Sequence, residues 1–411
     1  MSVLAPPKPS IRKSEATEQC NNQHKAFNYL SYAALILISV VMFTPLISKM
    51  SALGYDYVAH LSWANEIEQT GKIILPHPLY HILAIIARNL FSTNFTNAST
   101  IVVVASIAFL AILNFKILSK HSSRKVAVLF AVSLLLITPL QLYYFLDSHL
   151  YFGYVGITLY HSPTMLLLKP LSLIAFCYLL KSADCESRNR LLDGAILALA
   201  LLLSGISKPS FLMIILPAFL TFLFVTRKLK PMLKDPYIYC AFLIPVITVL
   251  TLQFFQTYFF QDLSKATGNT ESNITILPFE TMSYYSNYLL PKFFLSIAFP
   301  LMVFSCYAKH ALQSNSFIFS GICFVMGAIL QYFFAESGYR LYAGNFWWSG
   351  QIGSYLLFLF SVVFLLQNFS ALTITKIDKI KYSMCLLLFF AHTAFGVFYF
   401  KQEYFYMSKF W

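Results

Sequence analysis

Long apolar runs separated by short polar segments recur along almost the whole chain. An apolar run of about 20 residues is long enough to cross the hydrocarbon layer of a membrane as one helix. The pattern predicts spans at about 26–47, 100–115, 126–146, 164–180, 191–205, 210–226, 237–259, 292–307, 315–334, 349–367 and 382–400. We therefore predict an all-α polytopic membrane protein with about 11 transmembrane helices in a single transmembrane helical domain, 26–400.

Two shorter patterns within residues 54–88 have the spacing of amphipathic helices. In the first, Asp56 and His60 share a face, one turn apart, beside an apolar side. That apolar side consists of Tyr57, Leu61, Ala64 and Ile67. In the second, Pro78 stands at a favourable first position, and the polar stripe consists of His77, His81 and Arg88. Such helices lie along a membrane interface, so we predict two interfacial helices in the first external loop.

The basic residues set the direction of the chain through the membrane. If residues 73–91 stay outside, the basic loop KILSKHSSRK faces the cytosol, as the positive-inside rule requires. The N-terminus is then cytosolic and the C-terminus external, in a multi-pass protein of the inner, or plasma, membrane. The predicted external loops are 48–99, 147–163, 260–291 and 335–348. The predicted tails are a disordered cytosolic segment at 1–25 and an external aromatic segment at 401–411.

Composition supports the same class. The chain is 58% hydrophobic and only 11% charged, whereas a soluble domain carries roughly a quarter charged residues. The net charge of +13 would suggest nucleic acid in a soluble protein, but here the charges sit in short loops between spans, so we expect no nucleic-acid partner. The seven Cys are scattered without a CxxC pair, which indicates packing residues.

Ionisable residues crowd the predicted external face, which is the main functional signal in the sequence. Asp56, partly desolvated ahead of an interfacial helix, has the character of a general base, although an N-terminal helix cap is the alternative. The cations within or beside spans, Lys169 and Lys208, suggest function by their position, and with Arg340 they suit a phosphate at the headgroup level. The candidate substrate-binding residues are His60, His77, His81, Asp147, His149, His161, Lys169, Lys208, Glu336 and Arg340.

Other interpretations of these residues stay open. His77 and His81 have the spacing of a metal pair, but no HExxH motif or third ligand follows, so no metal is predicted. Hydrogen bonding to substrate and a structural role both remain for them. His161 precedes the helix-entry pattern Ser162-Pro163, so it is either a ligand or part of that entry. The aromatic residues around Arg340 either form an interface belt or stack on sugar or isoprenoid groups.

Several segments resemble the GT-C superfamily of integral membrane glycosyltransferases. They are the external loop with its two interfacial helices, the acidic residue in GYDYVAH (Asp56), and the PHPLYH entry to the second helix. TLYHSPT…KP and SKPSF resemble polytopic proteins of bacterial surface-polysaccharide pathways. The usual acidic pair of the superfamily is not obvious here, so a divalent metal stays open and no cofactor is predicted.

The resemblance implies a polyprenyl-phosphate sugar donor, a glycan or glycolipid acceptor, and a site among membrane lipids on the extracytoplasmic face. In the expected inverting transfer, Asp56 deprotonates the acceptor hydroxyl, and Arg340 with Lys208 or Lys169 holds the donor phosphate. Two alternatives remain: a lipid-linked saccharide flippase or other transporter, and a polysaccharide polymerase, ligase or membrane acyltransferase with another donor. A transporter is expected to show repeats and broken helices near mid-membrane.

Overall fold

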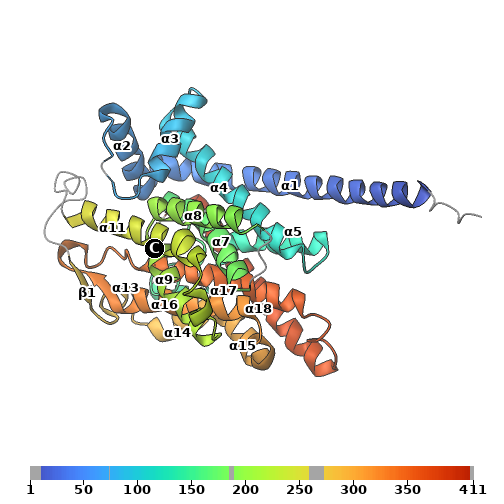
Figure 1. Cartoon of the computed structure of the whole chain (residues 1–411). Coiled ribbons are helices and arrows are strands. Elements are labelled where there is room, and N and C mark those ends of the chain that lie inside the picture. Colours follow the sequence, from blue (N-terminus) through green and yellow to red (C-terminus); the bar gives the residue numbers. More distant parts are fainter. Residues whose placement is uncertain (1–10, 74, 185–188, 259–272, 408–411) are drawn as a thin grey trace, which may run out of the picture.

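The computed structural model describes residues 11–73, 75–184, 189–258 and 273–407, with the backbone alone at 11–27, 55, 257, 258 and 339. It is almost entirely helical (Figure 1). The longer helices are α1 (Ile11–Leu53), α2 (Tyr55–Thr70), α3 (Leu79–Leu90), α4 (Phe95–Leu118), α5 (Arg124–Leu136), α7 (Pro163–Ala183), α8 (Arg190–Ser207), α9 (Ser210–Val225), α11 (Ile244–Tyr258), α14 (Leu289–Ser296), α15 (Ala298–Ala311), α16 (Asn315–Phe333), α17 (Trp347–Gln367) and α18 (Lys376–Tyr406). The short elements are α6 (Tyr144–Asp147), α10 (Leu229–Met232), η1 (Ile238–Leu243), β1 (Ile274–Ile276), α13 (Glu280–Tyr285), β2 (Phe334–Glu336) and η3 (Gly338–Arg340).

The predicted class of all-α polytopic membrane protein is confirmed. Among the described residues, 8 helices are long and apolar enough to cross a membrane, or 9 if the bent pair α14 and α15, which meet at 67°, forms one span. The predicted count of about 11 is not confirmed, because α9 has 16 residues and α5 has 13. The hairpin predicted around 206–209 does form, between α8 and α9.

The third predicted span, 126–146, is wrong as a continuous helix. Helix α5 ends at Leu136, three residues before Pro139. A proline disfavours helical backbone in the residue before it and has no N–H for the helix ladder. The chain therefore leaves α5 in an extended conformation, halfway along the expected span.

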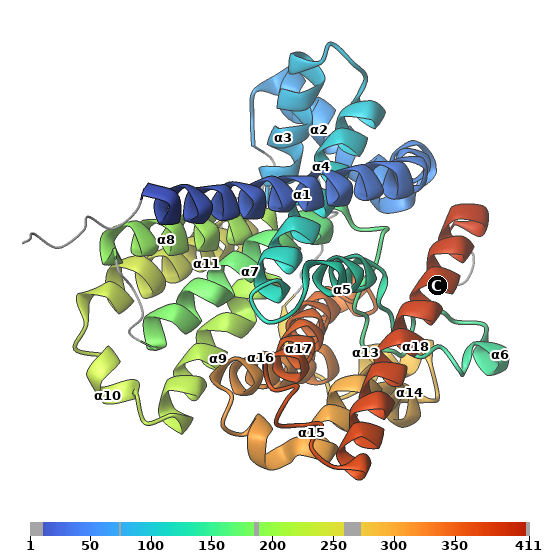
Figure 2. The ribbon, with the colours of Figure 1, turned by 90° about the vertical axis from the view of Figure 1, so that its right-hand side faces the viewer.

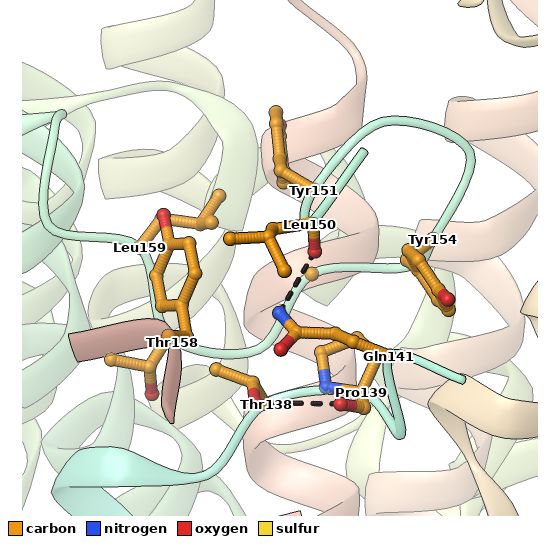
Figure 3. Close-up of a pocket in the computed structure, with 10 residues that line it drawn as sticks. Thr138, Pro139, Gln141, Leu150, Tyr151, Tyr154, Thr158 and Leu159 are labelled. Carbon is orange, nitrogen blue, oxygen red and sulfur yellow. Dashed lines mark hydrogen bonds between the residues drawn. The ribbon is translucent and has the colours of Figure 1, made fainter. Parts of the chain in front are cut away.

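The loop that follows, which we call the buried segment (residues 148–162), lies within the predicted external loop 147–163, and the side of the membrane that it faces stays a prediction. Nearly all its side chains are buried in the core. Figure 3 shows part of it, with Gln141 hydrogen-bonded to the Leu150 carbonyl at 2.8 Å across a small cavity. The cavity has room for about one water molecule. Irregular backbone at this depth is tolerated where protein surrounds it and satisfies its polar groups.

The two predicted amphipathic helices form at the expected positions. In Figure 1, α2 and α3 lie beyond the C-terminal end of α1 and run crosswise to it. Helix α3 packs His81 of its polar stripe inward, where it is fully buried, whereas Ile86 and Leu90 on the other face are exposed. This distribution is the one that an interfacial helix needs, with apolar side chains facing outward.

The two ends of the chain extend helices into the predicted tails. Helix α1 begins at Ile11, so it runs through much of the segment expected to be disordered, while residues 1–10 lie outside the described part. Helix α18 continues to Tyr406, through the first half of the predicted external aromatic tail, while residues 408–411 lie outside the described part. Figure 2 shows α17 in the middle of the bundle, with α16 and α9 on one side and α18 on the other. Helix α17 is almost entirely buried, whereas α1 and α18 expose most of their surface.

Helices α16 and α17 approach each other closely through glycine. A Cβ added at Gly353 of α17 would lie 2.8 Å from both the Cys323 carbonyl oxygen and the Phe324 Cα of α16. Both neighbours are backbone atoms, so the helices themselves would have to separate. Small residues commonly allow membrane helices to pack this closely.

This contact predicts that Gly353→Ala destabilises the protein by about 2 kcal/mol, because extra volume in a packed interface forces a backbone shift. Gly321→Ala on α16 is the matched control, since a Cβ there meets nothing within 4 Å. Thermal unfolding in lipid nanodiscs measures both. Equal stability of the two variants would contradict the close packing.

Candidate functional site

Asp56 lies in the first turn of α2, at the end of the molecule beyond α1. The N-cap of this helix is Gly54, and it provides no side-chain cap, so the capping role considered for Asp56 is not the one observed. A carboxylate in a first turn is stabilised by the helix dipole. The Asp56 side chain is partly buried, and its carboxylate forms no hydrogen bond or ion pair with any side chain that the structure describes.

Lys208 is the cation that interacts with Asp56. Burial lowers the pKa of Lys208 to about 8, and the nearby Asp56 opposes part of that shift. The ammonium lies 4.0 Å from the centre of the Trp348 ring and 3.4 Å from the Thr164 hydroxyl, to which it donates. It therefore remains largely protonated at neutral pH while being bound mainly to an aromatic face.

The sequence SKP explains the position of Lys208. It is the C-cap of α8, with extended backbone at φ −166° and ψ 134°, and Pro209 follows it as the N-cap of α9. The residue before a proline is driven out of the helical region, so the chain turns here. The turn therefore places Lys208 between α8 and α9, outside both helices.

His161 is the third member of this cluster. It stands at the end of the buried segment, just before the N-cap Ser162 and the first-turn Pro163 of α7, so the predicted helix entry is confirmed. Its ring centre is 5.6 Å from that of Trp348 and 5.5 Å from that of Tyr151. Burial lowers its pKa to about 4, with Asp56 raising it and Lys208 lowering it, so the imidazole is neutral at pH 7.

His77 and Arg340 extend the cluster on another side. Burial, followed in order of size by Lys208, His81 and Arg340, lowers the pKa of His77 to about 3. Arg340 Nε lies 3.0 Å from Glu336 Oε2. Glu336, predicted to bind substrate, is thus the ion-pair partner of Arg340. It is held in β2, where it pairs with Ile274 of β1.

His60 and His81 are bound to each other. His60 Nδ1 and His81 Nε2 are 3.0 Å apart, and both rings are buried. Burial lowers the pKa of both, that of His81 to about 4. The structure therefore joins α2 to α3 through two neutral imidazoles. Whether either touches a substrate stays a prediction.

Three other predicted substrate residues have structural partners outside this cluster. Asp147 forms an ion pair with Lys292 of α14 and accepts a hydrogen bond from Ser286 at 3.1 Å. The backbone N–H of His149 donates to Asp147 Oδ1 at 3.1 Å. Lys169 is buried within its span and donates to the Ile157 carbonyl at 2.7 Å, so its ammonium holds the buried segment. A substrate role for these residues is not tested by their positions.

Sequence reasoning missed one residue that supports the site, Gln253, and one that supports the buried segment, Lys292. Gln253 of α11 donates to the carbonyls of Pro76 and Gly205, at 3.3 and 2.7 Å, and so ties the loop before His77 to the end of α8. Lys292 has no exposed surface in its side chain. A lone glutamine or lysine inside an apolar run was the available signal for each.

The arrangement brings together one carboxylate, one ammonium and neutral imidazoles beside indole and phenol rings. A carboxylate of this kind can accept a proton, and an ammonium with its guanidinium neighbour can bind an anion. In the described part of the chain, no group of three or more His, Cys, Asp or Glu is placed to hold a metal ion.

The Asp147–Lys292 pair predicts that Asp147→Asn lowers stability by about 3 kcal/mol, because it leaves a fully buried ammonium without its counter-charge. Thermal unfolding in nanodiscs measures the loss, and Glu280→Gln, at an exposed carboxylate, is the control. Unchanged stability together with weakened substrate binding would instead place Asp147 in a substrate site.

Comparison with known proteins supplies no family for the chain. No protein-family model matches it, and no curated protein matches its sequence. The function therefore has to be argued from the residues of the site itself.

Proposed function

We propose that this protein is a membrane glycosyltransferase that transfers a sugar from a polyprenyl-phosphate donor to a hydroxyl of a glycan or glycolipid on the extracytoplasmic face. The observation that carries the proposal is the state of Asp56. It is a partly buried carboxylate without a hydrogen-bond partner among the described side chains, and it interacts with Lys208 and His161 from two other segments. A carboxylate used only for structure is normally hydrogen-bonded when it is removed from water.

The cations beside Asp56 support the phosphate part of the proposal. Lys208 has no carboxylate bonded to it among the described residues, and its ammonium rests on Trp348. Arg340 and Lys208 both lower the pKa of His77 through their positive charge. Two cations outside the spans, at the end of the bundle where α2 and α3 lie, suit the phosphate of a donor whose lipid tail remains in the membrane.

The chemistry follows from these roles. The acceptor O–H gives its proton to Asp56 as its oxygen attacks the anomeric carbon of the donor. The bond between that carbon and the phosphate oxygen breaks, and the phosphate leaves with the bonding electron pair. Lys208 and Arg340 stabilise the charge that develops on the phosphate. Attack opposite the leaving phosphate inverts the configuration, and Asp56 then releases its proton to solvent.

Aromatic rings provide surfaces for the sugar. Tyr151, His161 and Trp348 form one contiguous set, and Trp347 lies 5.8 Å from Tyr151 between ring centres. Phe152 stacks on Tyr285 at 4.2 Å, so these two rings cover one face of each other. Aromatic faces suit the apolar side of a pyranose or an isoprenoid unit, in keeping with a lipid-linked sugar.

A transporter of lipid-linked saccharides is the second candidate, and two observations favour it. Helix α5 stops at Leu136 and the chain continues as the buried segment, and α14 and α15 are broken by 67°. Broken helices of this kind line binding sites in transporters. A polymerase, ligase or acyltransferase would use the same external site with a different donor.

The proposal predicts that Asp56→Asn reduces sugar transfer at least a thousandfold, because the amide accepts no proton from the acceptor. Glu66→Gln, an exposed change on the same helix, is the matched control and should keep wild-type activity. The measurement is release of labelled sugar from a panel of polyprenyl-phosphate sugars by the purified protein in nanodiscs.

Two results would reject this assignment. Full transfer by Asp56→Asn would remove Asp56 from the chemistry. Intact donor in all samples, with movement of the lipid-linked sugar across liposomes, would establish the transporter instead.

The pKa of Lys208 predicts an alkaline limit. Because the ammonium loses its proton at about pH 8, kcat/KM for the donor should fall as the pH rises through that value in the ligand-free enzyme. Lys208→Arg should move the limit upward, since a guanidinium stays charged. The same limit in wild type and Lys208→Arg would assign it to another group.

A further inference from the structure

The His60–His81 pair has a chemistry that the proposed function does not use. The two rings come from different helices, α2 and α3, and are packed among Trp63 and Tyr80, with ring centres 5.1 and 5.8 Å from His60. His81 has no exposed surface, and His60 keeps 8% of its own. Only His60, of the two, retains an edge that a ligand can reach.

The surroundings of the pair favour one placement of its protons. The Pro78 carbonyl, three residues before His81, raises the pKa of that ring as a nearby acceptor, although Nδ1 forms no hydrogen bond with the described residues. A carbonyl only accepts, so it favours the proton on His81 Nδ1 and leaves Nε2 as a lone pair. That lone pair lies 3.0 Å from His60 Nδ1, which must then be the donor.

His60 is consequently left with one free nitrogen, Nε2, and it carries a lone pair. It makes no hydrogen bond with the described residues. A second proton on this ring is disfavoured by burial and by the nearby His81, His77 and Lys208. The pair therefore presents a hydrogen-bond acceptor, not a cation. Asp56, one turn earlier on α2, shares the face from which it projects.

We propose that His60 binds a hydroxyl of the acceptor saccharide through Nε2, and that His81 is a positioning residue that holds His60 in this tautomer. This inference rests on the proposed function and divides its site into two parts. A lone pair attracts an O–H donor and repels a phosphate oxygen, which also only accepts. The donor phosphate therefore belongs with Lys208 and Arg340, and the acceptor hydroxyl belongs beside His60 and Asp56.

Three substitutions separate the roles of the two rings. In His60→Asn the amide replaces Nδ1 and still donates to His81, but the acceptor at the Nε2 position is lost. In His81→Gln the side-chain oxygen replaces Nε2 and still accepts from His60, whereas His81→Leu removes that acceptor. His310→Gln, at an exposed histidine on α15, is the control for handling and purity.

The first experiment measures the KM of each substrate in the transfer assay. We expect His60→Asn to raise the KM for the acceptor about tenfold, the equivalent of one hydrogen bond, with the KM for the donor unchanged. His81→Leu should show the same selective change, and His81→Gln should restore wild-type values. A change in the KM for the donor, or an equal loss in both His81 variants, would overturn the inference.

A second experiment keeps failure of the inference distinct from failure of the proposed function. Binding of sugar-free polyprenyl phosphate to the protein in nanodiscs should be weakened by Lys208→Met and unchanged in His60→Asn. Equal weakening in both would put His60 in the phosphate site and overturn the division.

If wild type neither transfers sugar nor binds this lipid, the proposed function fails, and thermal stabilisation by an oligosaccharide panel decides about His60. Stabilisation lost in His60→Asn and kept in His81→Gln supports a saccharide site, and no stabilisation of wild type rejects it.

Discussion

The rest of the structure depends on one constraint, the need to satisfy an irregular stretch of backbone deep inside a membrane protein. The buried segment, 148–162, has no helix to pair its own polar groups, and each unpaired group costs several kcal/mol in an apolar interior. Side chains from many elements supply the bonds. Gln141 donates to Leu150, Lys292 to Phe152, Gln331 to Tyr154, Lys169 and Gln351 to Ile157, and Tyr57 to Tyr160, while Ser296 accepts from Val155. The segment is thus the point where α2, α7, α14, α16 and α17 are fixed relative to one another.

The same segment places the candidate site. Its last residue before the helix entry is His161. Tyr57, which donates a hydrogen bond to the Tyr160 carbonyl of the segment, is the neighbour of Asp56 on α2. Lys169 donates to the Ile157 carbonyl, and Lys292 donates to the Phe152 carbonyl and forms an ion pair with Asp147. Lys208 differs, because it donates to no carbonyl or carboxylate that the structure describes, but only to the Thr164 hydroxyl beside the Trp348 ring. Lys169 and Lys292 therefore stabilise the backbone of the segment, whereas the Lys208 ammonium remains available to an anion.

The periodic parts of the molecule were predictable from the sequence, and the irregular parts were not. Helices α4, α7, α8, α16 and α17 lie where apolar runs predict them, and the inward face of α2 carries Tyr57, Leu61, Ala64 and Ile67 as its spacing indicates. Pro139 marks the end of α5, but a span of 21 residues was expected to continue past it because the apolar character continues. The buried segment contains two histidines and follows Asp147, and this polar composition predicts an external loop. Nothing local reveals its partners, such as Gln331 and Gln351, which lie more than 170 residues away along the chain. The convergence of Asp56, His161 and Lys208 was expected from topology alone, whereas the pairing of His60 with His81 needed the relative placement of two helices.

Burial also decides which groups of the site carry charge. The histidines stay neutral because desolvation disfavours their charged form, so the positive charge nearest to Asp56 is the Lys208 ammonium, with which Asp56 interacts without forming an ion pair. Arg340, by contrast, forms an ion pair with Glu336. Within the proposed function, a phosphate that binds Lys208 and Arg340 adds negative charge next to Asp56. The two cations therefore have to balance the phosphate and Asp56 together, and the neutral histidines add no charge of their own.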